Sequence, residues 1–214
     1  MIAAYIFDLD GTLLDTEIAW VEATANYLSS KGHPVTHDFS MKAVYGRSWA
    51  DVYAAIVTAF PDLDMGLDQM QAELDDFFYA IRDKLDTRIH ESVNLLKQLS
   101  KTTPCCIVSG SPRRHITEAI EIMDAAENVS FYLGSSDYPH GKPHPSGFLI
   151  AAERLGVLPA ECVVFEDSFV GVTAGKAAGM KTVALSRPGH PQQDVGAADL
   201  ILPDLSQFDP KVFE

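Results

Sequence analysis

Short apolar runs alternate with amphipathic stretches along most of this chain. The runs that we predict as strands cover residues 3–7, 104–108, 129–133, 161–165, 181–185 and 199–202. Between most of them, apolar residues recur at helical spacing, most clearly over residues 112–123, 146–155 and 168–178. A strand followed by a helix, repeated, is typical of a parallel sheet covered by helices on both faces. The pattern therefore predicts an α/β fold.

The segment from residue 16 to residue 87 breaks this alternation, because it contains no convincing strand. Its apolar residues step by three and four positions, which is typical of helices with one buried face. The helices predicted from this spacing cover Ile18 to Leu28, residues 48–60 and Leu67 to Leu85. We predict an α/β core made of residues 1–15 and 88–214, with a small all-helical cap domain, residues 16–87, inserted after the first strand.

Composition and charge narrow the range of partners. The chain has 47% hydrophobic residues, and its 30 acidic residues against 16 basic ones give a formal net charge of −14. Such a charge repels nucleic acid and anionic lipid, so an anionic substrate needs a local positive site. No apolar segment is long enough to span a bilayer, and the N-terminus lacks a basic leader. We expect a cytoplasmic protein that binds neither nucleic acid nor membrane, with a monomer as the default state.

Residues with chemically active side chains follow the carboxyl ends of several predicted strands. In an open parallel sheet, ligands bind beyond these ends, where successive loops converge. We therefore predict that four separate segments form one crevice. Their polar and small residues are Asp8, Asp10, Ser109, Gly110, Ser111, Lys142, Glu166 and Asp167.

These residue types suit phosphoryl transfer. Asp8, Asp10 and Asp167 would repel one another without a cation between them, and hard oxygen ligands favour Mg²⁺. A carboxylate can attack phosphorus, while the Lys142 ammonium and the Ser109 hydroxyl can neutralise the phosphoryl group. Asp10, two residues after Asp8, lies on the same side of an extended chain. It is placed to protonate the leaving oxygen and then to activate water.

Four ordered motifs carry a family resemblance. The stretches "DLDGTLLDTE", "IVSGS", "GKPHP" and "FEDSFVGVTAGKAAGM" resemble the motifs of the haloacid dehalogenase superfamily, specifically its β-phosphoglucomutase-like branch with a helical cap. The resemblance spans nearly the whole chain. It implies a Rossmann-like core and Mg²⁺-dependent phosphoryl transfer, with a cap that closes over the substrate.

The resemblance also implies residue roles. Asp8 would be the nucleophile and Asp10 the general acid/base, while Ser109 and Lys142 would hold the phosphoryl group. The implied metal ligands are Asp8, Asp10 through its carbonyl, Glu166 and Asp167. The expected substrate-binding residues are Gly46, Arg47 and Ser48 in the cap, with Gly110 and Ser111 in the core.

Several functions compete on this fold. A haloacid dehalogenase would not need Asp10, and a phosphonatase would need a cap lysine, for which nothing marks Lys42. A phosphomutase remains an alternative function. Two features count against it: Trp20 occupies the position where we expect a histidine in phosphomutases of this branch, and the stretch from Leu67 to Tyr79 contains four acidic residues and no lysine or arginine. The intact acids and Lys142 disfavour a non-catalytic binding protein. The sequence thus predicts a Mg²⁺-dependent phosphatase for a small phosphorylated metabolite, with a sugar phosphate favoured and a phosphomutase as the alternative.

Overall fold

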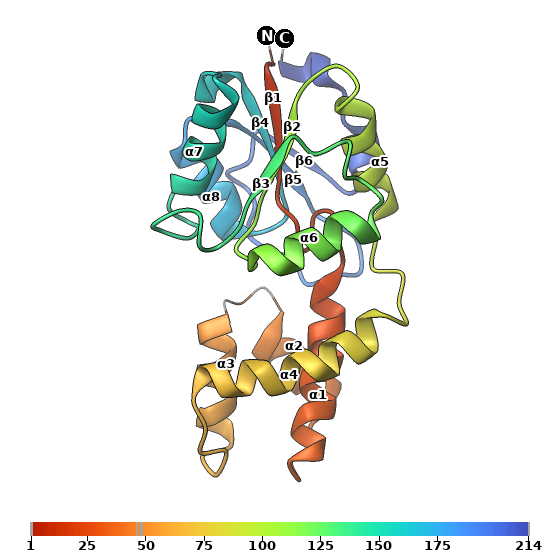
Figure 1. The fold of residues 1–214 in the computed structure, drawn as a ribbon, viewed down its shortest axis with the longest axis vertical. Coiled ribbons are helices and arrows are strands. Elements are labelled where there is room, and N and C mark those ends of the chain that lie inside the picture. The colour runs from red at the N-terminus through yellow and green to blue at the C-terminus, as the bar shows by residue number, and fades with distance from the viewer. Residues whose placement is uncertain (1, 46, 48, 214) are drawn as a thin grey trace. The chain divides into compact units, whose positions relative to one another are not determined.

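The computed structural model describes residues 2–45, 47 and 49–213. The chain divides into two compact units (Figure 1). We call Met1–Leu14 with Arg88–Glu214 the core unit and Asp15–Thr87 the helical unit. The chain therefore leaves the core unit soon after its first strand and returns to it 73 residues later, since positions 15 to 87 make up the inserted unit.

The core unit is built on a parallel sheet of six strands in the order β3-β2-β1-β4-β5-β6. The strands are β1 (Ala4–Phe7), β2 (Cys105–Val108), β3 (Phe131–Leu133), β4 (Cys162–Glu166), β5 (Lys181–Leu185) and β6 (Leu200–Leu202). In β1, Tyr5 lies opposite Cys105 of β2 and Val163 of β4. All six predicted strands are confirmed, and each observed end lies within two residues of the predicted one.

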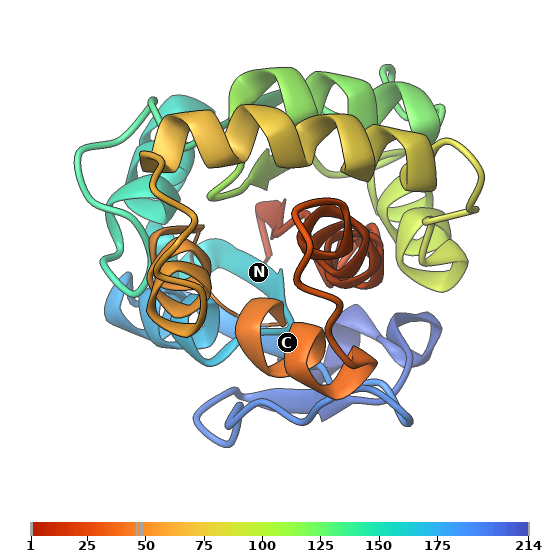
Figure 2. The same cartoon turned by 90° about the horizontal axis from the view of Figure 1, so that it is seen from below.

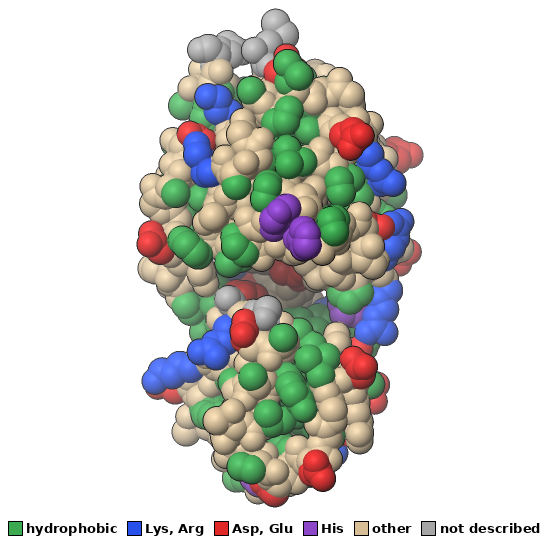
Figure 3. Space-filling view, turned by 90° about the vertical axis from the view of Figure 1, so that its left-hand side faces the viewer, with side chains coloured by type: hydrophobic (Ala, Val, Ile, Leu, Met, Phe, Trp, Pro, Cys, Tyr) green, Lys and Arg blue, Asp and Glu red, His purple; other side chains and the backbone are tan. Residues whose placement is uncertain are grey.

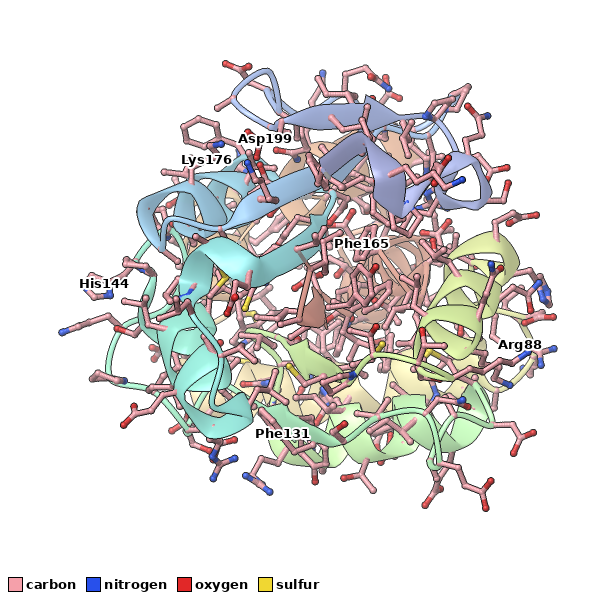
Figure 4. All side chains as sticks on the ribbon, turned by 90° about the horizontal axis from the view of Figure 1, so that it is seen from above. Arg88, Phe131, His144, Phe165, Lys176 and Asp199 are labelled. Atoms are coloured by element: carbon pink, nitrogen blue, oxygen red, sulfur yellow. The ribbon has the colours of Figure 1, made fainter. Side chains whose placement is uncertain are left out.

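Both faces of the sheet are buried. Along β1, Tyr5 and Phe7 belong to one apolar cluster, whereas Ala4 and Ile6 belong to another, as the alternation of side chains along a strand requires. Phe165 of β4 stacks on Phe7 with ring centroids 4.5 Å apart and lies near the middle of the core unit (Figure 4). Strands buried on two faces are apolar at successive positions. For this reason the strands can be recognised in the sequence as continuous apolar segments.

Four α-helices cover the sheet among the described residues of the core unit. They are α5 (His90–Leu99), α6 (Arg113–Ile122), α7 (Ser146–Leu155) and α8 (Phe169–Ala177). Apolar residues of α5 and α6 join the cluster that contains Phe7, and those of α7 and α8 join the cluster that contains Ile6. Three short 3₁₀ helices complete the unit: Pro159–Glu161, Leu205–Gln207 and Pro210–Phe213. The predicted Rossmann-like arrangement, with helices on both faces, is confirmed.

The helical unit consists of α1 (Thr16–Ser30), α2 (His37–Val44), α3 (Trp49–Ala59) and α4 (Leu67–Arg82), with no strand in its described residues. Buried apolar side chains from all four helices share one core. Figure 2 shows α1 nearly end-on while α4 runs lengthwise, so these two packed helices cross steeply. The spacing of apolar residues does not predict α2. This helix has eight residues, too few to show a clear stripe, and begins where the Thr36 hydroxyl accepts a bond from the Phe39 N–H at 3.2 Å.

No helix in the part of the chain that the structure describes has the length and apolar character needed to cross a membrane.

Candidate active site

A tight loop after β1 holds the two leading carboxylates. The Asp8 N–H still bonds to the neighbouring strand, donating to the Phe165 carbonyl at 2.9 Å. The chain then folds back, because the Gly11 N–H donates to the Leu14 carbonyl at 2.8 Å. Gly11 has φ +82°, a left-handed conformation that glycine adopts without a steric cost. Asp8 is buried at the base of this loop and Asp10 is half-buried further along it.

Lys142 is fixed by contacts at the carboxyl ends of three different strands, β1, β2 and β4. Its ammonium donates to the Asp8 carboxylate, to Oε1 of Glu166 at 2.6 Å and to the carbonyl of Val108 at 3.1 Å. It also lies 5.1 Å from the centre of the Phe148 ring, within range of a cation–π interaction. The ammonium therefore occupies one defined position beside Asp8.

Glu166, the last residue of β4, is fully buried and bonded within the protein through both oxygens. Oε1 accepts from Lys142, while Oε2 accepts from the Asp167 N–H at 3.0 Å and from the N–H and hydroxyl of Ser168 at 3.1 and 2.9 Å. A β-carbon on Gly171, in the first turn of α8, would lie 1.7 Å from Oε1. The glycine thus leaves the space that this carboxylate fills, and Glu166 fixes both Lys142 and the turn into α8.

Three carboxylates form a cluster suited to a divalent cation. Asp8, Glu166 and Asp167 each offer an oxygen, and these oxygens lie within 4.8 Å of one another. Oxygen donors without sulfur or nitrogen suit Mg²⁺. Asp167 also lies close to the first loop, where the Thr12 hydroxyl donates to its Oδ1 at 3.4 Å. The side-chain cluster does not include Asp10, whose predicted part in metal binding runs through its main-chain carbonyl and stays a prediction.

The electrostatics of the site show an excess of negative charge. Burial raises the pKa of Asp8 well above its ordinary value of 3.8, and the charges of Glu166 and Asp10 raise it further against the opposing effect of Lys142. Burial alone would lower the pKa of Lys142, but Asp8 and Glu166 outweigh it and raise that pKa above its ordinary value. One ammonium does not neutralise the surrounding carboxylates, so a cation among them would relieve their repulsion.

Two serines after β2 approach Asp10. The Ser111 hydroxyl donates to Oδ2 of Asp10 at 2.7 Å, and the Ser109 hydroxyl donates to the same oxygen at 3.3 Å. Gly110 lies exposed between them. The structure thus brings Asp8, Asp10, Ser109, Gly110, Ser111, Lys142, Glu166 and Asp167 to one edge of the sheet. Their predicted roles stay predictions.

The other predicted substrate contacts belong to the helical unit. Arg47 is exposed in the helical unit, before α3. Gly46 and Ser48 lie outside the described residues. The role in substrate binding proposed for these three residues stays a prediction.

One buried side chain at the site was missed by sequence reasoning. The Tyr138 hydroxyl donates to the Ser109 carbonyl at 2.7 Å, and burial raises the pKa of this tyrosine. Tyr138 therefore anchors the main chain that carries Ser109. It stands in a loop with no periodic pattern, and nothing in the local sequence distinguishes it from a surface tyrosine.

The histidines near Lys142 lie apart from the charged cluster. The rings of His140 and His144 are 4.7 Å apart, and Nδ1 of His144 lies 2.6 Å from the hydroxyl of Ser146 at the start of α7. Both histidines are exposed. Histidine side chains are visible side by side on the face in Figure 3, and Figure 4 shows His144 at the periphery, directed away from the sheet. These rings therefore belong to the surface of the loop before α7.

Comparison with known proteins relates this geometry to a family. The sequence profile of the haloacid dehalogenase-like hydrolases matches residues 2–179. The chain is 29% identical over 203 residues to validoxylamine A 7'-phosphate phosphatase of Streptomyces hygroscopicus subsp. limoneus, covering 94% of this chain and 93% of that protein. It is 28% identical over 207 residues to the phosphorylated carbohydrates phosphatase of Thermotoga maritima, covering 94% of each. The crystal structure of β-phosphoglucomutase from Clostridium difficile superposes with a TM-score of 0.78 at 21% identity, over 99% of this chain and 95% of that one, which shows a shared fold.

Proposed function

The chain belongs to the haloacid dehalogenase-like hydrolases, and we propose that it is a Mg²⁺-dependent phosphatase that hydrolyses a small phosphorylated metabolite, most simply a sugar phosphate. The observation that carries this proposal is the buried Asp8 carboxylate, which lies against the Lys142 ammonium and within a cluster of carboxylates. This arrangement pairs a nucleophile with a fixed positive charge at a single point, as transfer of an anionic phosphoryl group requires.

In the first half-reaction, a carboxylate oxygen of Asp8 attacks phosphorus and forms an aspartyl phosphate. The bond from phosphorus to the ester oxygen breaks, and Asp10 donates its proton to that departing oxygen. Lys142 and the Ser109 hydroxyl donate to the phosphoryl oxygens and balance their charge. Lys142 is pre-positioned by Asp8, Glu166 and the Val108 carbonyl, and the Ser109 hydroxyl oxygen accepts from the Ser111 N–H.

In the second half-reaction, Asp10 is a carboxylate and takes a proton from water. The water oxygen attacks phosphorus, the bond between phosphorus and the Asp8 oxygen breaks, and inorganic phosphate leaves. Asp8 regains its carboxylate and Asp10 its proton, so the enzyme returns to its starting state. The same two acids thus serve both halves of the cycle.

Asp8 and Asp167 would hold Mg²⁺, with Glu166 as a third carboxylate of the cluster. When bound, this cation supplies positive charge that offsets the repulsion between nucleophile and phosphoryl group. Both oxygens of Glu166 already accept hydrogen bonds from the protein. Glu166 therefore serves chiefly to orient Lys142 and Asp167.

A phosphatase is favoured over a phosphomutase. Two proteins similar along nearly their whole length are named phosphatases, and one of them is named for phosphorylated carbohydrates. The likeness to β-phosphoglucomutase concerns the fold. Within the helical unit, Trp20 packs its ring on Phe78 with centroids 3.9 Å apart. It offers no second positive group for a sugar bisphosphate.

The test is a screen of phosphorylated metabolites with Mg²⁺, in which released phosphate is measured and Asp8→Asn serves as the blank. We expect release from sugar monophosphates that disappears in the variant. β-Glucose 1-phosphate is followed in parallel for glucose 6-phosphate. Isomerisation without phosphate release would replace the proposal with a phosphomutase.

A further inference from the structure

The geometry points to Ser111 as a positioning residue that orients the carboxylate of Asp10 for proton transfer, in place of the substrate contact expected from the sequence. This inference rests on the proposed phosphatase function, in which Asp10 is the general acid and base. It concerns a residue that bonds to Asp10 directly and acts on the reaction through that carboxylate.

The two serine contacts to Asp10 differ in strength. Ser111 Oγ lies 2.7 Å from Oδ2 of Asp10, the usual length for a hydroxyl that donates to a carboxylate. Ser109 Oγ lies 3.3 Å from the same oxygen, beyond the usual range. Of these two serines, Ser111 is therefore the stronger donor to Asp10.

Proton counting separates the roles of the two hydroxyls. A serine hydroxyl has one hydrogen to donate. Ser109 Oγ accepts from the Ser111 N–H at 3.0 Å, so its single hydrogen goes either to Asp10 or to a phosphoryl oxygen. When a phosphoryl group binds at Ser109, that hydrogen leaves Asp10. Ser111 then keeps its bond to Oδ2 of Asp10 and holds the carboxylate while the reaction proceeds.

The main chain fixes Ser111 well enough for this task. Its carbonyl accepts from the Ser135 N–H at 3.0 Å, and its own N–H donates to Ser109. The loop after β3 packs against the same carbonyl, because a β-carbon on Gly134 would lie 2.9 Å from that oxygen. Ser111 is thus tied to both the β2 and β3 loops, and its hydroxyl starts from a rigid position.

The test compares two phosphate esters whose leaving groups differ in their need for a proton from a general acid. An alkyl phosphate needs a general acid because the alkoxide is a poor leaving group, whereas p-nitrophenolate leaves as a stable anion. The quantity compared is kcat/KM, which reports the step that forms the phosphoenzyme. In Ser111→Ala we expect kcat/KM for an alkyl sugar phosphate to fall on the order of 10-fold or more, part of the about 10²- to 10⁴-fold contribution of a general acid. For p-nitrophenyl phosphate we expect a fall of about 3-fold or less on the same grounds.

Control variants keep the outcome interpretable. Ser111→Thr retains the hydroxyl and should show the wild-type ratio of kcat/KM between the two esters. If Ser111→Ala does not fold, Ser111→Cys replaces it, because cysteine keeps the side-chain volume, and the same selective loss is expected. Ser136→Ala removes an exposed hydroxyl from the neighbouring loop and should leave both values unchanged. Equal losses for both esters, or a higher KM with unchanged kcat, would overturn the inference and return Ser111 to structure or substrate binding. A wild-type enzyme that hydrolyses neither ester would instead overturn the proposed function, and this inference with it.

Discussion

A β-carbon on Gly11 would lie 2.1 Å from Oδ2 of Asp167, so the main chain of the first loop lies directly against this carboxylate. The two residues are 156 positions apart in the sequence, as their numbers show. Gly11 allows this close contact with Asp167 because it has no side chain and adopts a φ of +82° without a steric cost. The position of Asp167 therefore depends on a glycine in a distant motif.

Gly11→Ala should weaken metal binding. The added methyl group displaces Asp167, so we expect the Mg²⁺ concentration for half-maximal activity to rise about 10-fold, the equivalent of roughly 1.4 kcal/mol. The left-handed backbone adds a cost of about 1–2 kcal/mol to stability. Activity is titrated with Mg²⁺ and unfolding is followed with urea.

Gly179→Ala is the matched control for this substitution. Gly179 has φ +75°, but nothing lies within 4 Å of the added carbon. This variant should share the loss of stability and keep the wild-type Mg²⁺ dependence. Equal Mg²⁺ dependence in the two variants would show that the contact between Gly11 and Asp167 does not govern metal affinity.

Asp8→Asn should abolish turnover while the protein stays folded. The amide is a far weaker nucleophile, and loss of a catalytic nucleophile costs on the order of 10⁴-fold or more in kcat. The amide oxygen still accepts from Lys142, and one of several repelling negative charges is removed. We therefore expect a melting temperature without Mg²⁺ at least equal to that of the wild type. Turnover close to that of the wild type would remove Asp8 from the mechanism.

Mg²⁺ should stabilise the protein more as the pH rises. The pKa of Asp8 is raised in the folded state, so without metal its contribution to stability is fully present below the ordinary value of 3.8 and is lost as the pH rises through the raised value. Mg²⁺ binds only the ionised carboxylate, so the stabilisation that it provides increases as the pH rises, whereas the stability without metal decreases. Melting temperatures with Mg²⁺ and with EDTA should diverge between acid and neutral pH. Identical curves at every pH would contradict a metal site at Asp8.

Lys142→Met should reduce both stability and activity. The substitution leaves the buried carboxylates of Asp8 and Glu166 without their cation, and removing one partner of a buried ion pair costs about 3–5 kcal/mol. Mg²⁺ should recover part of this stability, because it supplies positive charge at the same cluster. The free energy of unfolding is measured with and without Mg²⁺, together with kcat and KM.

Lys176→Met provides a comparison at an exposed ion pair. Lys176 of α8 forms an ion pair with Asp199 at 2.6 Å. The two side chains lie next to each other in Figure 4. Exposed pairs contribute about 0–1 kcal/mol, so we expect a small change in stability and unchanged kinetics. If Lys176→Met lowered the free energy of unfolding as much as Lys142→Met does, the destabilisation by Lys142→Met could not be attributed to the burial of Lys142 in the site.

The sequence by itself determined the strands, the helical insertion and the identities of the charged residues. Strands buried on both faces must be apolar at successive positions, so their pattern is local and legible. Polar residues directly after such strands stand out for the same reason. Asp8, Asp10, Ser109 and Asp167 were selected in this way, whereas Lys142 was selected from the "GKPHP" motif and its order among the other motifs. The short helix α2, by contrast, has too few turns to produce a pattern.

Only the tertiary structure decided which side chains meet. Ser111 and Asp10 are 101 positions apart, and Tyr138 bonds to the main chain of a strand end 29 positions away. The inward contacts of Glu166 likewise depend on Lys142 and on the space left by Gly171. Each contact follows from how strands and loops pack in three dimensions. The residues next to each side chain in the sequence do not indicate which distant residue it will contact, because that contact forms only when the strands and loops pack together.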